Sequence, residues 1–236
     1  MLKIDDDLAI ANHVKISNVW MFSDKQGRRF IIDTGDRVER IALRFDLGRE
    51  NSQTDNGVDG ILLTHRHRDH AGNAAWLRER FRCPVACHEL DKPFLEGFQK
   101  MHAEVSKTIP FYVKIAWWIE NNMPTISPVD KTYTDGDSLL GFQVFSAPGH
   151  SDGSVLLYHQ DSQTLFSGDA ILAGPLSYGI REILHLKNDN HPIKIAMKHH
   201  RYKELLKILP PVTRLCSGHG PVIRGNINNM LRKLIK

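Results

Sequence analysis

The sequence is poor in cysteine and has no long apolar run, and both shortages restrict what the protein can be. Its three cysteines, Cys83, Cys87 and Cys216, are too few and odd in number for a disulfide framework, which favours a reducing compartment. No segment approaches the ~20 consecutive apolar residues that a membrane-spanning helix requires. The acidic residues 5–7 stand where a secretory signal would need a basic start. We therefore expect a cytoplasmic protein without a membrane segment.

A strong charge of one sign is also missing. The 31 Lys and Arg residues exceed the 27 Asp and Glu residues only slightly, and the net charge of +4 is too small to indicate a nucleic-acid partner. Basic residues do gather after His191, where Glu204 is the only acid. This bias suits either an anionic substrate or a solvent-exposed helix face. The sequence thus disfavours a nucleic-acid partner but leaves that alternative open.

Neither low-complexity segments nor internal repeats interrupt the 236 residues. A hydrophobic content of 41% and a charged content of 25% are typical of soluble globular proteins. The length is at the upper end for one α/β domain, so we expect a single domain that spans residues 1–236.

The spacing of apolar residues predicts a chain that alternates β-rich and helical segments. The predicted strands are 8–12, 18–23, 29–33, 59–63, 84–87, 131–134, 141–146, 154–159, 164–167 and 213–216. The predicted helices are 38–47, 71–81, 92–106, 111–121, 193–209 and 226–235. Residues 59–87 therefore have the strand–helix–strand order of a βαβ unit. We expect Cys83 and Cys87 to be core residues, and His88, at the end of the second strand, to be a structural histidine.

Residues 89–122 depart from this pattern and form a predicted helical insertion. Its second helix, 111–121, carries a cluster of large apolar side chains, namely Phe111, Tyr112, Ile115, Trp117, Trp118 and Ile119. Such a surface needs to be covered. It packs against the body of the domain, closes over a functional site as a lid, or forms the contact of a homodimer, and the sequence leaves these three uses open.

The stretch richest in chemistry is residues 64–70, which read Thr-His-Arg-His-Arg-Asp-His directly after three apolar residues. Three histidines and an aspartate are seldom buried together without partners, and a metal would supply the partner. Zinc, iron and manganese all accept imidazole nitrogens and carboxylate oxygens. At a strand end, His65 and His67 can face one point, while Asp69 and His70 serve a second point nearby. The alternative is a solvated, histidine-rich surface loop.

Three later strand ends share one pattern, in which an apolar run leads into a turn of small residues with one ligand-type side chain. These side chains are His150, Asp169 and His219, and each follows a glycine. Glycine permits a tight turn and a close approach of the backbone. One such turn alone is ordinary, but three in order behind the histidine cluster indicate a metal site assembled from the whole chain.

With these residues in place, the sequence resembles the metallo-β-lactamase superfamily. The family signature HxHxDH, followed by separate His, Asp and His residues, is matched by His65, His67, Asp69, His70, His150, Asp169 and His219. Residues 18–20 and the Asp33-Thr34-Gly35 triplet are also similar to the family's N-terminal motif. The resemblance covers nearly the whole chain and implies an αββα sandwich, in which helices flank two mixed β-sheets and a binuclear metal site lies at one edge.

The resemblance also implies a role for each ligand. His65, His67 and His150 would hold the first metal, Asp69, His70 and His219 the second, and Asp169 would bridge the two. Two divalent ions roughly 3.5–4 Å apart lower the pKa of a bridging water toward ~7, so that hydroxide is available at neutral pH. Asp69 would orient this hydroxide and pass its proton on. Zinc is the expected metal, with iron and manganese as alternatives.

Departures from the family's branches narrow the expected substrate. Asp169 stands where penicillin-degrading branches have Cys or Ser, and His67 stands where flavodiiron reductases have Glu. Residues 220–236 are too few for the helical domain with which glyoxalase II thioesterases bind glutathione, and the RNA-binding arm of the tRNA-maturation nucleases is not found. Lactonases match in length and ligands, but Ile171 and Leu172 replace their catalytic tyrosine, and Tyr178 is distant.

These observations predict a binuclear metal-dependent hydrolase that uses a metal-bridging hydroxide on a small ester, thioester or lactone. Two alternatives remain. The basic C-terminal segment agrees with a phosphodiesterase or nuclease. A mononuclear iron dioxygenase acting on persulfides belongs to a branch that keeps much of the same motif.

Overall fold

Seven strands from the N-terminal half form one β-sheet in chain order. The computed structural model describes residues 1–48, 57–99, 114–115, 118–119, 122–123, 126–174 and 193–235. The strands are β1 (Leu2–Lys3), β2 (Leu8–Ile10), β3 (Trp20–Ser23), β4 (Arg29–Ile32), β5 (Gly60–Leu62), β6 (Val85–His88) and β7 (Lys131–Tyr133). β1 to β4 are antiparallel neighbours, whereas β4 to β7 are parallel.

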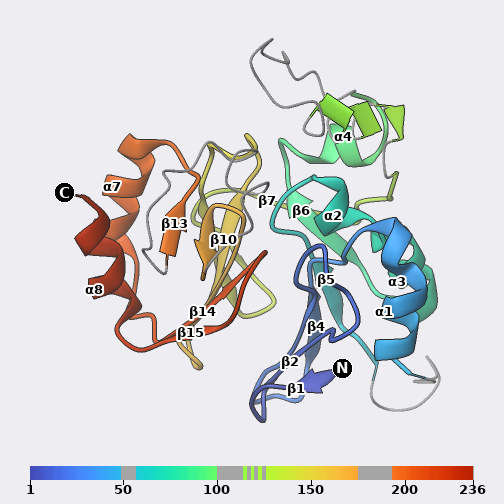
Figure 1. Cartoon of the computed structure of the whole chain (residues 1–236), viewed down its shortest axis with the longest axis horizontal. Helices are drawn as coiled ribbons and strands as arrows, with labels where there is room; N and C mark the ends of the chain where they lie inside the picture. Colours follow the sequence, from blue (N-terminus) through green and yellow to red (C-terminus); the bar gives the residue numbers. More distant parts are fainter. Residues whose placement is uncertain are drawn as a thin grey trace.

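Parallel neighbours need crossover connections, and helices supply them. The short helix η1 (Arg37–Glu39) and α1 (Arg40–Asp46) join β4 to β5. α2 (Arg68–Ala71) and α3 (Ala74–Phe81) join β5 to β6, and α4 (Lys92–Leu95) follows β6. α1 and α3 cover the outer face of this sheet (Figure 1). The predicted βαβ unit is confirmed, because β5 and β6 are parallel neighbours.

The C-terminal half forms a second sheet with the strand order β15-β14-β11-β10-β9-β8. Its strands are β8 (Ser138–Leu139), β9 (Phe142–Ser146), β10 (Val155–His159), β11 (Thr164–Gly168), β14 (Arg214–Ser217) and β15 (Ile223–Arg224). β12 (Ile171–Ala173) and β13 (Ile193–Ile195) form a separate antiparallel pair. Helices α7 (His199–Ile208) and α8 (Ile227–Arg232), which continues into η2 (Lys233–Ile235), cover the outer face (Figure 1).

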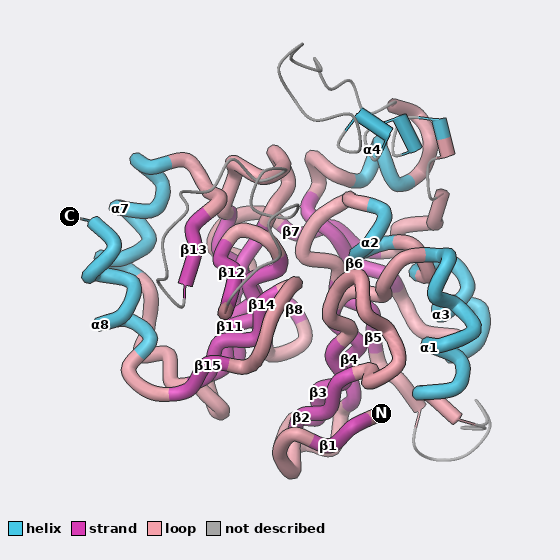
Figure 2. The backbone as a smooth tube through the Cα atoms, viewed as in Figure 1, coloured by secondary structure: helices cyan, strands magenta, loops and turns pink. Residues whose placement is uncertain are grey.

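Helices, sheet, sheet and helices follow one another as four layers (Figure 2). Among the described residues, a hydrophobic core fills the space between each pair of neighbouring layers. The middle core lies between the two sheets, where the rings of Phe30 and Phe142 meet at 5.3 Å. The other two cores lie under the helices on either side. The αββα sandwich expected from the sequence is therefore confirmed. In the described part of the chain, no helix is both long and apolar enough to span a membrane.

Two predicted helices were wrong in extent. Residues 193–195, expected at the start of helix 193–209, form β13 instead, because Ile193 and Ile195 alternate with Lys194 and pair with β12. The helix 92–106 ends at Leu95, since Gly97 adopts a left-handed φ of 79° and breaks the helical path. Residues 100–106, and most of the predicted helix 111–121, lie outside the described residues.

The helix at 38–47 is confirmed, but the apolar spacing that predicted it faces solvent. Val38, Ile41 and Phe45 are all exposed, while the same segment buries Leu43 and Leu47. The helix ends before Gly48, as expected, and this glycine adopts a φ of 62°.

The direction of the strands brings the predicted ligands to one edge of the sandwich. β11 is parallel to β14, and β9 runs in the same direction because both β9 and β11 are antiparallel to β10. The segments that follow β9, β11 and β14 carry the three later ligands. The backbone N–H of Val155 donates to the Thr64 carbonyl at 3.0 Å and joins this edge to the end of β5. All four ligand-bearing segments therefore meet at the same edge.

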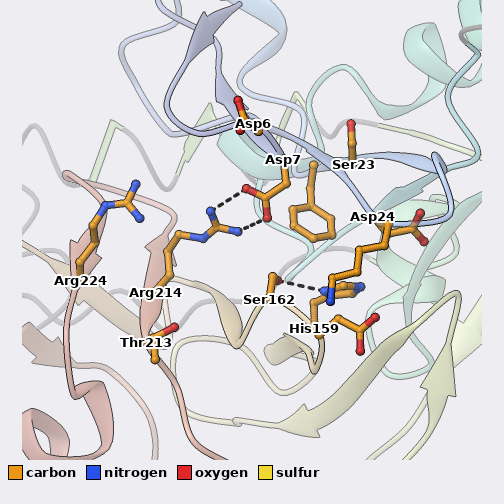
Figure 3. Close-up of a pocket in the computed structure, with 12 residues that line it drawn as sticks. Asp6, Asp7, Ser23, Asp24, His159, Ser162, Thr213, Arg214 and Arg224 are labelled. Carbon is orange, nitrogen blue, oxygen red and sulfur yellow. Dashed lines mark hydrogen bonds and ion pairs between the residues drawn. The ribbon is translucent and has the colours of Figure 1, made fainter.

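A cleft of about 640 Å³ lies at the other end of the sandwich, among the ends of β3, β10 and β14, and none of the seven ligands lines it. Arg214, the first residue of β14, points its guanidinium at the Asp7 carboxylate there, with one N···O distance of 2.7 Å (Figure 3). The same side chain donates to Asp5 and, through Nε, to the Thr164 hydroxyl at 2.8 Å. Arg214 thus fastens the second sheet to the N-terminal turn of the first.

We expect the Arg214→Met variant to unfold with a free energy roughly 1–3 kcal/mol lower than wild type, because a mostly buried cation and its hydrogen bonds are lost. Urea denaturation measures this. Arg224, which is half exposed and also pairs with Asp5, is the matched control, and Arg224→Met should cost under ~1 kcal/mol. Equal losses in both variants would show that the buried position of Arg214 has no special weight.

Candidate metal centre

The seven predicted ligands converge in three overlapping groups. Within each group the candidate ligand atoms lie within 4.8 Å of one another. The groups are His65 with His67 and His150, Asp69 with His70 and His219, and His65 with His70 and Asp169. Residues that lie up to 154 positions apart in the sequence thus form one continuous cluster. The alternative of a solvated loop at residues 64–70 does not describe this arrangement, since His65 and His70 are buried.

The first cluster consists of the imidazoles of His65, His67 and His150. Nδ1 of His67 lies 2.7 Å from Nε2 of His150, and the His65 ring lies 4.7 Å and 4.8 Å from the other two rings. Three imidazoles with no carboxylate among them form the kind of donor set that zinc accepts in catalytic sites.

The second cluster consists of Asp69, His70 and His219, and the Asp169 carboxylate lies beside it. Nε2 of His219 lies 3.4 Å from Asp69 Oδ2 and 3.3 Å from Asp169 Oδ2, and Nε2 of His70 lies 3.3 Å from Asp169 Oδ1. Asp169 Oδ2 also lies 3.5 Å from Nε2 of His150, which belongs to the first cluster. Asp169 therefore lies between the two clusters and faces both.

Beneath the ligands, Asp33 sets the tautomers of two histidines. Its carboxylate accepts from the Thr64 hydroxyl at 2.7 Å and from Nδ1 of His70 at 2.8 Å. Because the Thr64 hydroxyl donates to Asp33, we assign it as the acceptor for Nδ1–H of His65 at 3.1 Å. Both histidines are then protonated on Nδ1 and present the Nε2 lone pair to the cluster, as metal ligands do.

The buried polar atoms of the site fit a metal. His65 Nε2, His70 Nε2 and Asp169 Oδ1 are buried and have no hydrogen-bond partner among the described residues. Leaving such atoms unpaired is costly in a protein interior. A cation in the cluster would satisfy all three. The donor chemistry, imidazole and carboxylate only, agrees with zinc, iron or manganese.

The two clusters differ in charge. Burial lowers the pKa of His67 to about 4 and that of His150 to about 3, so the first cluster is neutral at pH 7. Burial also opposes charge on His219, but Asp169 outweighs it and raises the pKa to about 10. Despite burial, the pKa of Asp169 is held well below its usual value by His219 and His70. A divalent ion in the second cluster would replace imidazolium protons as the partner of the carboxylates.

The N-terminal motif of the sequence also contributes. The Ser17 hydroxyl donates to the Asp69 carbonyl, and the Asn18 amide donates to the Ser217 carbonyl at 2.9 Å. Nε1 of Trp20 donates to the same carbonyl at 3.2 Å. Residues 17–20 thus tie the loop of Asp69 to the turn of His219. Sequence reasoning noted the Asn18 strand and Asp33 but assigned no role to either.

The residues predicted to be structural lie outside the cluster. His88 is satisfied on both ring nitrogens, because Nδ1 accepts from the Leu90 N–H at 3.2 Å and Nε2 lies 3.1 Å from the Ser146 hydroxyl. Cys83 and Cys87 are buried in a hydrophobic core as free thiols. Tyr178 lies outside the described residues.

The residue before His219 has to be a glycine, because a side chain at position 218 would collide with two of the other ligands. A Cβ at this position would lie 2.3 Å from Asp169 Oδ1 and 2.5 Å from His70 Cε1. We expect Gly218→Ala to displace these ligands and weaken metal binding roughly 10- to 100-fold, which titration against a chelator measures. Gly57 is the matched control, since nothing lies within 4 Å of its Cβ position, and Gly57→Ala should bind metal normally. Normal binding by both variants would contradict the assigned geometry.

Comparison with known proteins agrees with this geometry. A family model described as the metallo-beta-lactamase superfamily matches residues 14–219. The probable metallo-hydrolase YqgX of Bacillus subtilis is 30% identical over 190 residues, with 76% of this chain and 80% of that protein covered. A hydroxyacylglutathione hydrolase of Halorhodospira halophila is 28% identical over 207 residues, and the chain spans 60% of its length. The crystal structure of TTHA1623 in a di-iron-bound form is 30% identical, with a TM-score of 0.59 over 92% of this chain and 93% of that one.

Proposed function

Because the chain belongs to the metallo-beta-lactamase superfamily and is a metal-dependent hydrolase, we propose that it binds two divalent ions and hydrolyses a small ester, thioester or lactone. One observation carries the binuclear proposal. Asp169 faces His150 of the first cluster as well as His70 and His219 of the second, at 3.3–3.5 Å. A carboxylate in this position is suited to bridge two cations. His65, His67 and His150 would hold one ion, and Asp69, His70 and His219 the other.

Two bound ions would polarise the substrate oxygen and lower the pKa of a shared water toward ~7. The chain contributes a proton acceptor at the same place. The Asp69 side chain is 27% exposed, whereas that of Asp169 is 5% exposed, so Asp69 is the carboxylate that opens toward a substrate. Its pKa is held well below the usual value, against the effect of burial, by His70 and His219. Asp69 is therefore ionised at neutral pH and suited to orient a water and accept its proton.

The proposed metal is zinc, with iron and manganese as alternatives. The three-histidine cluster supports zinc. The di-iron form of TTHA1623 supports iron at a related site. Relatives named as hydroxyacylglutathione hydrolases support the thioester part of the substrate class, since acylglutathiones are thioesters, and the chain spans 60% and 53% of two of them. The basic C-terminal segment gives the nuclease alternative less support, because Arg214 and Arg224 pair with Asp5 at the far end of the sandwich.

A parallel assay of zinc-, manganese- and iron-loaded protein tests the proposal. The panel contains a p-nitrophenyl ester, an S-acylglutathione, an acyl lactone and bis(p-nitrophenyl) phosphate. We expect two metal equivalents per chain and hydrolysis of at least one of the first three compounds. Cleavage of the phosphodiester alone would favour the phosphodiesterase alternative. One iron per chain with oxygen consumption on a persulfide would favour the dioxygenase.

The proposal also covers the cellular location and the oligomeric state of the protein. The free thiols of Cys83, Cys87 and Cys216 support a cytoplasmic location. We also propose a homodimer through the segment 111–121, for which a helix is predicted, and the exposure of Trp118 and Ile115 supports it.

A further inference from the structure

Arg66 stands between two ligands of the first cluster, and its side chain turns away from them toward Asp91. Nη1 of Arg66 donates to Asp91 Oδ1 at 2.7 Å. The guanidinium also stacks on the Phe94 ring of α4, with Cζ 4.1 Å from the ring centroid. A stacked, mostly buried guanidinium is held in one orientation, and its backbone is therefore held as well. The loop of His65 and His67 is thus anchored to Asp91.

The same carboxylate reaches the other loop of the first cluster. The hydroxyl of Ser151, the residue after His150, lies 3.4 Å from Asp91 Oδ2 and 2.8 Å from the Ser154 hydroxyl. Gly153 approaches Asp91 so closely that a Cβ there would lie 2.3 Å from Asp91 Cγ. Asp91 is therefore packed directly against the turn that presents His150.

The burial of Asp91 makes this link a strong constraint. The residue is 0% exposed, and a buried carboxylate needs a cation and hydrogen-bond donors to remain charged. Arg66 is the cation, and its Nε has no hydrogen-bond partner in the described part of the chain, so its ion pair with Asp91 is its main polar contact. Movement of the Arg66 loop would leave this buried charge uncompensated, and movement of the His150 turn would take the Ser151 hydroxyl away from Asp91.

We propose that Asp91 is a positioning residue for the first cluster, because one buried carboxylate holds the loop of His65 and His67, through Arg66, against the turn of His150, through Ser151. Asp91 touches none of the three ligands and differs in this from Asp33, which contacts His70 directly. The inference rests on the proposed metal site and adds a residue that acts on one of its halves.

The test compares metal binding by wild type and by Asp91→Ala and Asp91→Asn, using Zn²⁺ titrated against a chromophoric chelator and Co²⁺ absorption spectra. We expect the affinity of the first cluster for metal, called here the histidine-only site because His65, His67 and His150 form it, to fall roughly 10- to 100-fold in Asp91→Ala. The loss should be smaller in Asp91→Asn. The second site should keep its affinity. Ser151→Ala removes only the contact to the His150 turn and should weaken the same site less.

Asp36 offers a matched control. It pairs at 3.1 Å with Arg68, the other arginine of the histidine motif. Within the described part of the chain, its carboxylate bonds to Arg68 and to the Val38 N–H and not to the His150 turn. Asp36→Asn should keep both affinities. Thermal unfolding of metal-free protein shows whether each variant folds, and if Asp91→Ala does not, Asp91→Asn and Ser151→Ala decide.

The outcomes separate this inference from the proposed function. Unchanged affinity of the histidine-only site in the folded Asp91 and Ser151 variants overturns the role of Asp91, whatever the wild-type stoichiometry. An equal loss in Asp36→Asn also overturns it. Wild-type protein that binds one ion contradicts the binuclear proposal, and Asp91 is then judged on the affinity for that ion.

Discussion

Replacing Asp169 with alanine is expected to lower the rate of hydrolysis by roughly three orders of magnitude and to leave at most one tightly bound metal. Asp169 is the one carboxylate that faces both clusters, at 3.5 Å from His150 and 3.3 Å from His219. Without it, two cations would share a buried site with one carboxylate, and about 4 kcal/mol of lost stabilisation corresponds to a thousandfold slower rate. Metal analysis after gel filtration and steady-state kinetics measure the two effects.

The control for this variant lies on the same hairpin. Asp161 is exposed in the turn between β10 and β11, at the far end from the site, and Asp161→Asn should keep full activity and both metals. Asp169→Ala protein that retains two metals and more than about a tenth of the wild-type rate would contradict the bridging role.

Replacing Asp33 with asparagine is expected to weaken metal binding 10- to 100-fold, the range typical for residues that orient metal ligands. Asp33 uses both of its oxygens as acceptors. Oδ1 accepts from the Thr64 backbone N–H, and Oδ2 accepts from the Thr64 hydroxyl and from Nδ1 of His70. An asparagine has only one acceptor oxygen. The amide NH₂ would face His70 Nδ1, which can stay hydrogen-bonded only by giving up its proton. His70 would then carry the proton on Nε2, where it cannot bind a metal.

The choice of asparagine separates this chemistry from backbone strain. Asp33 has a φ of 58°, a conformation that asparagine tolerates better than alanine. Histidine ring NMR of the zinc-loaded protein reports which nitrogen of His70 carries the proton. The metal-free protein is unsuitable because, despite burial, Asp69 and Asp169 raise the pKa of His70 well above its usual value there. Chelator titration reports the affinity. Asp24, also buried, accepts from Gln26, Arg28 and the Arg28 side chain at the other end of the sheet, so Asp24→Asn should lose stability and keep metal affinity. An unchanged His70 tautomer in Asp33→Asn would contradict the account.

The ligands could be predicted from the sequence because each is a metal-binding residue type and also stands in a turn after an apolar strand. Buried histidines and aspartates are unusual, and each predicted ligand follows an apolar strand and stands beside a turn. The parallel arrangement of β11 and β14 then brings Asp169 and His219 to the same edge. Ligand-type residues in the turns that follow predicted strands can therefore be recognised from the sequence alone.

The supporting residues could not be found in this way, because their roles depend on partners far along the chain. Asp91 acts through Arg66 and Ser151, which lie 25 and 60 positions away. Nothing in the local sequence distinguishes Asp91 from a helix-capping aspartate. The resemblance to a family motif drew attention to Asp33, but its link to Thr64 and His70 required the fold.

The errors in secondary structure have similar causes. The 193–195 segment is short, and its strand conformation depends on pairing with β12, which itself was not predicted. The apolar spacing in α1 correctly predicted a helix, but Ile41 and Phe45 point outward, since Leu43 and Leu47 fill the core instead. Periodicity thus identified the helix and not its buried face.

The central claim is that two cations occupy one cluster and share Asp169. Crystals of the zinc-loaded protein, with anomalous differences collected at the zinc edge, test it most directly. The account predicts two peaks, one bound by His65, His67 and His150 and the other by Asp69, His70 and His219, with Asp169 in contact with both. A single peak, or two peaks of which Asp169 binds only one, would contradict it.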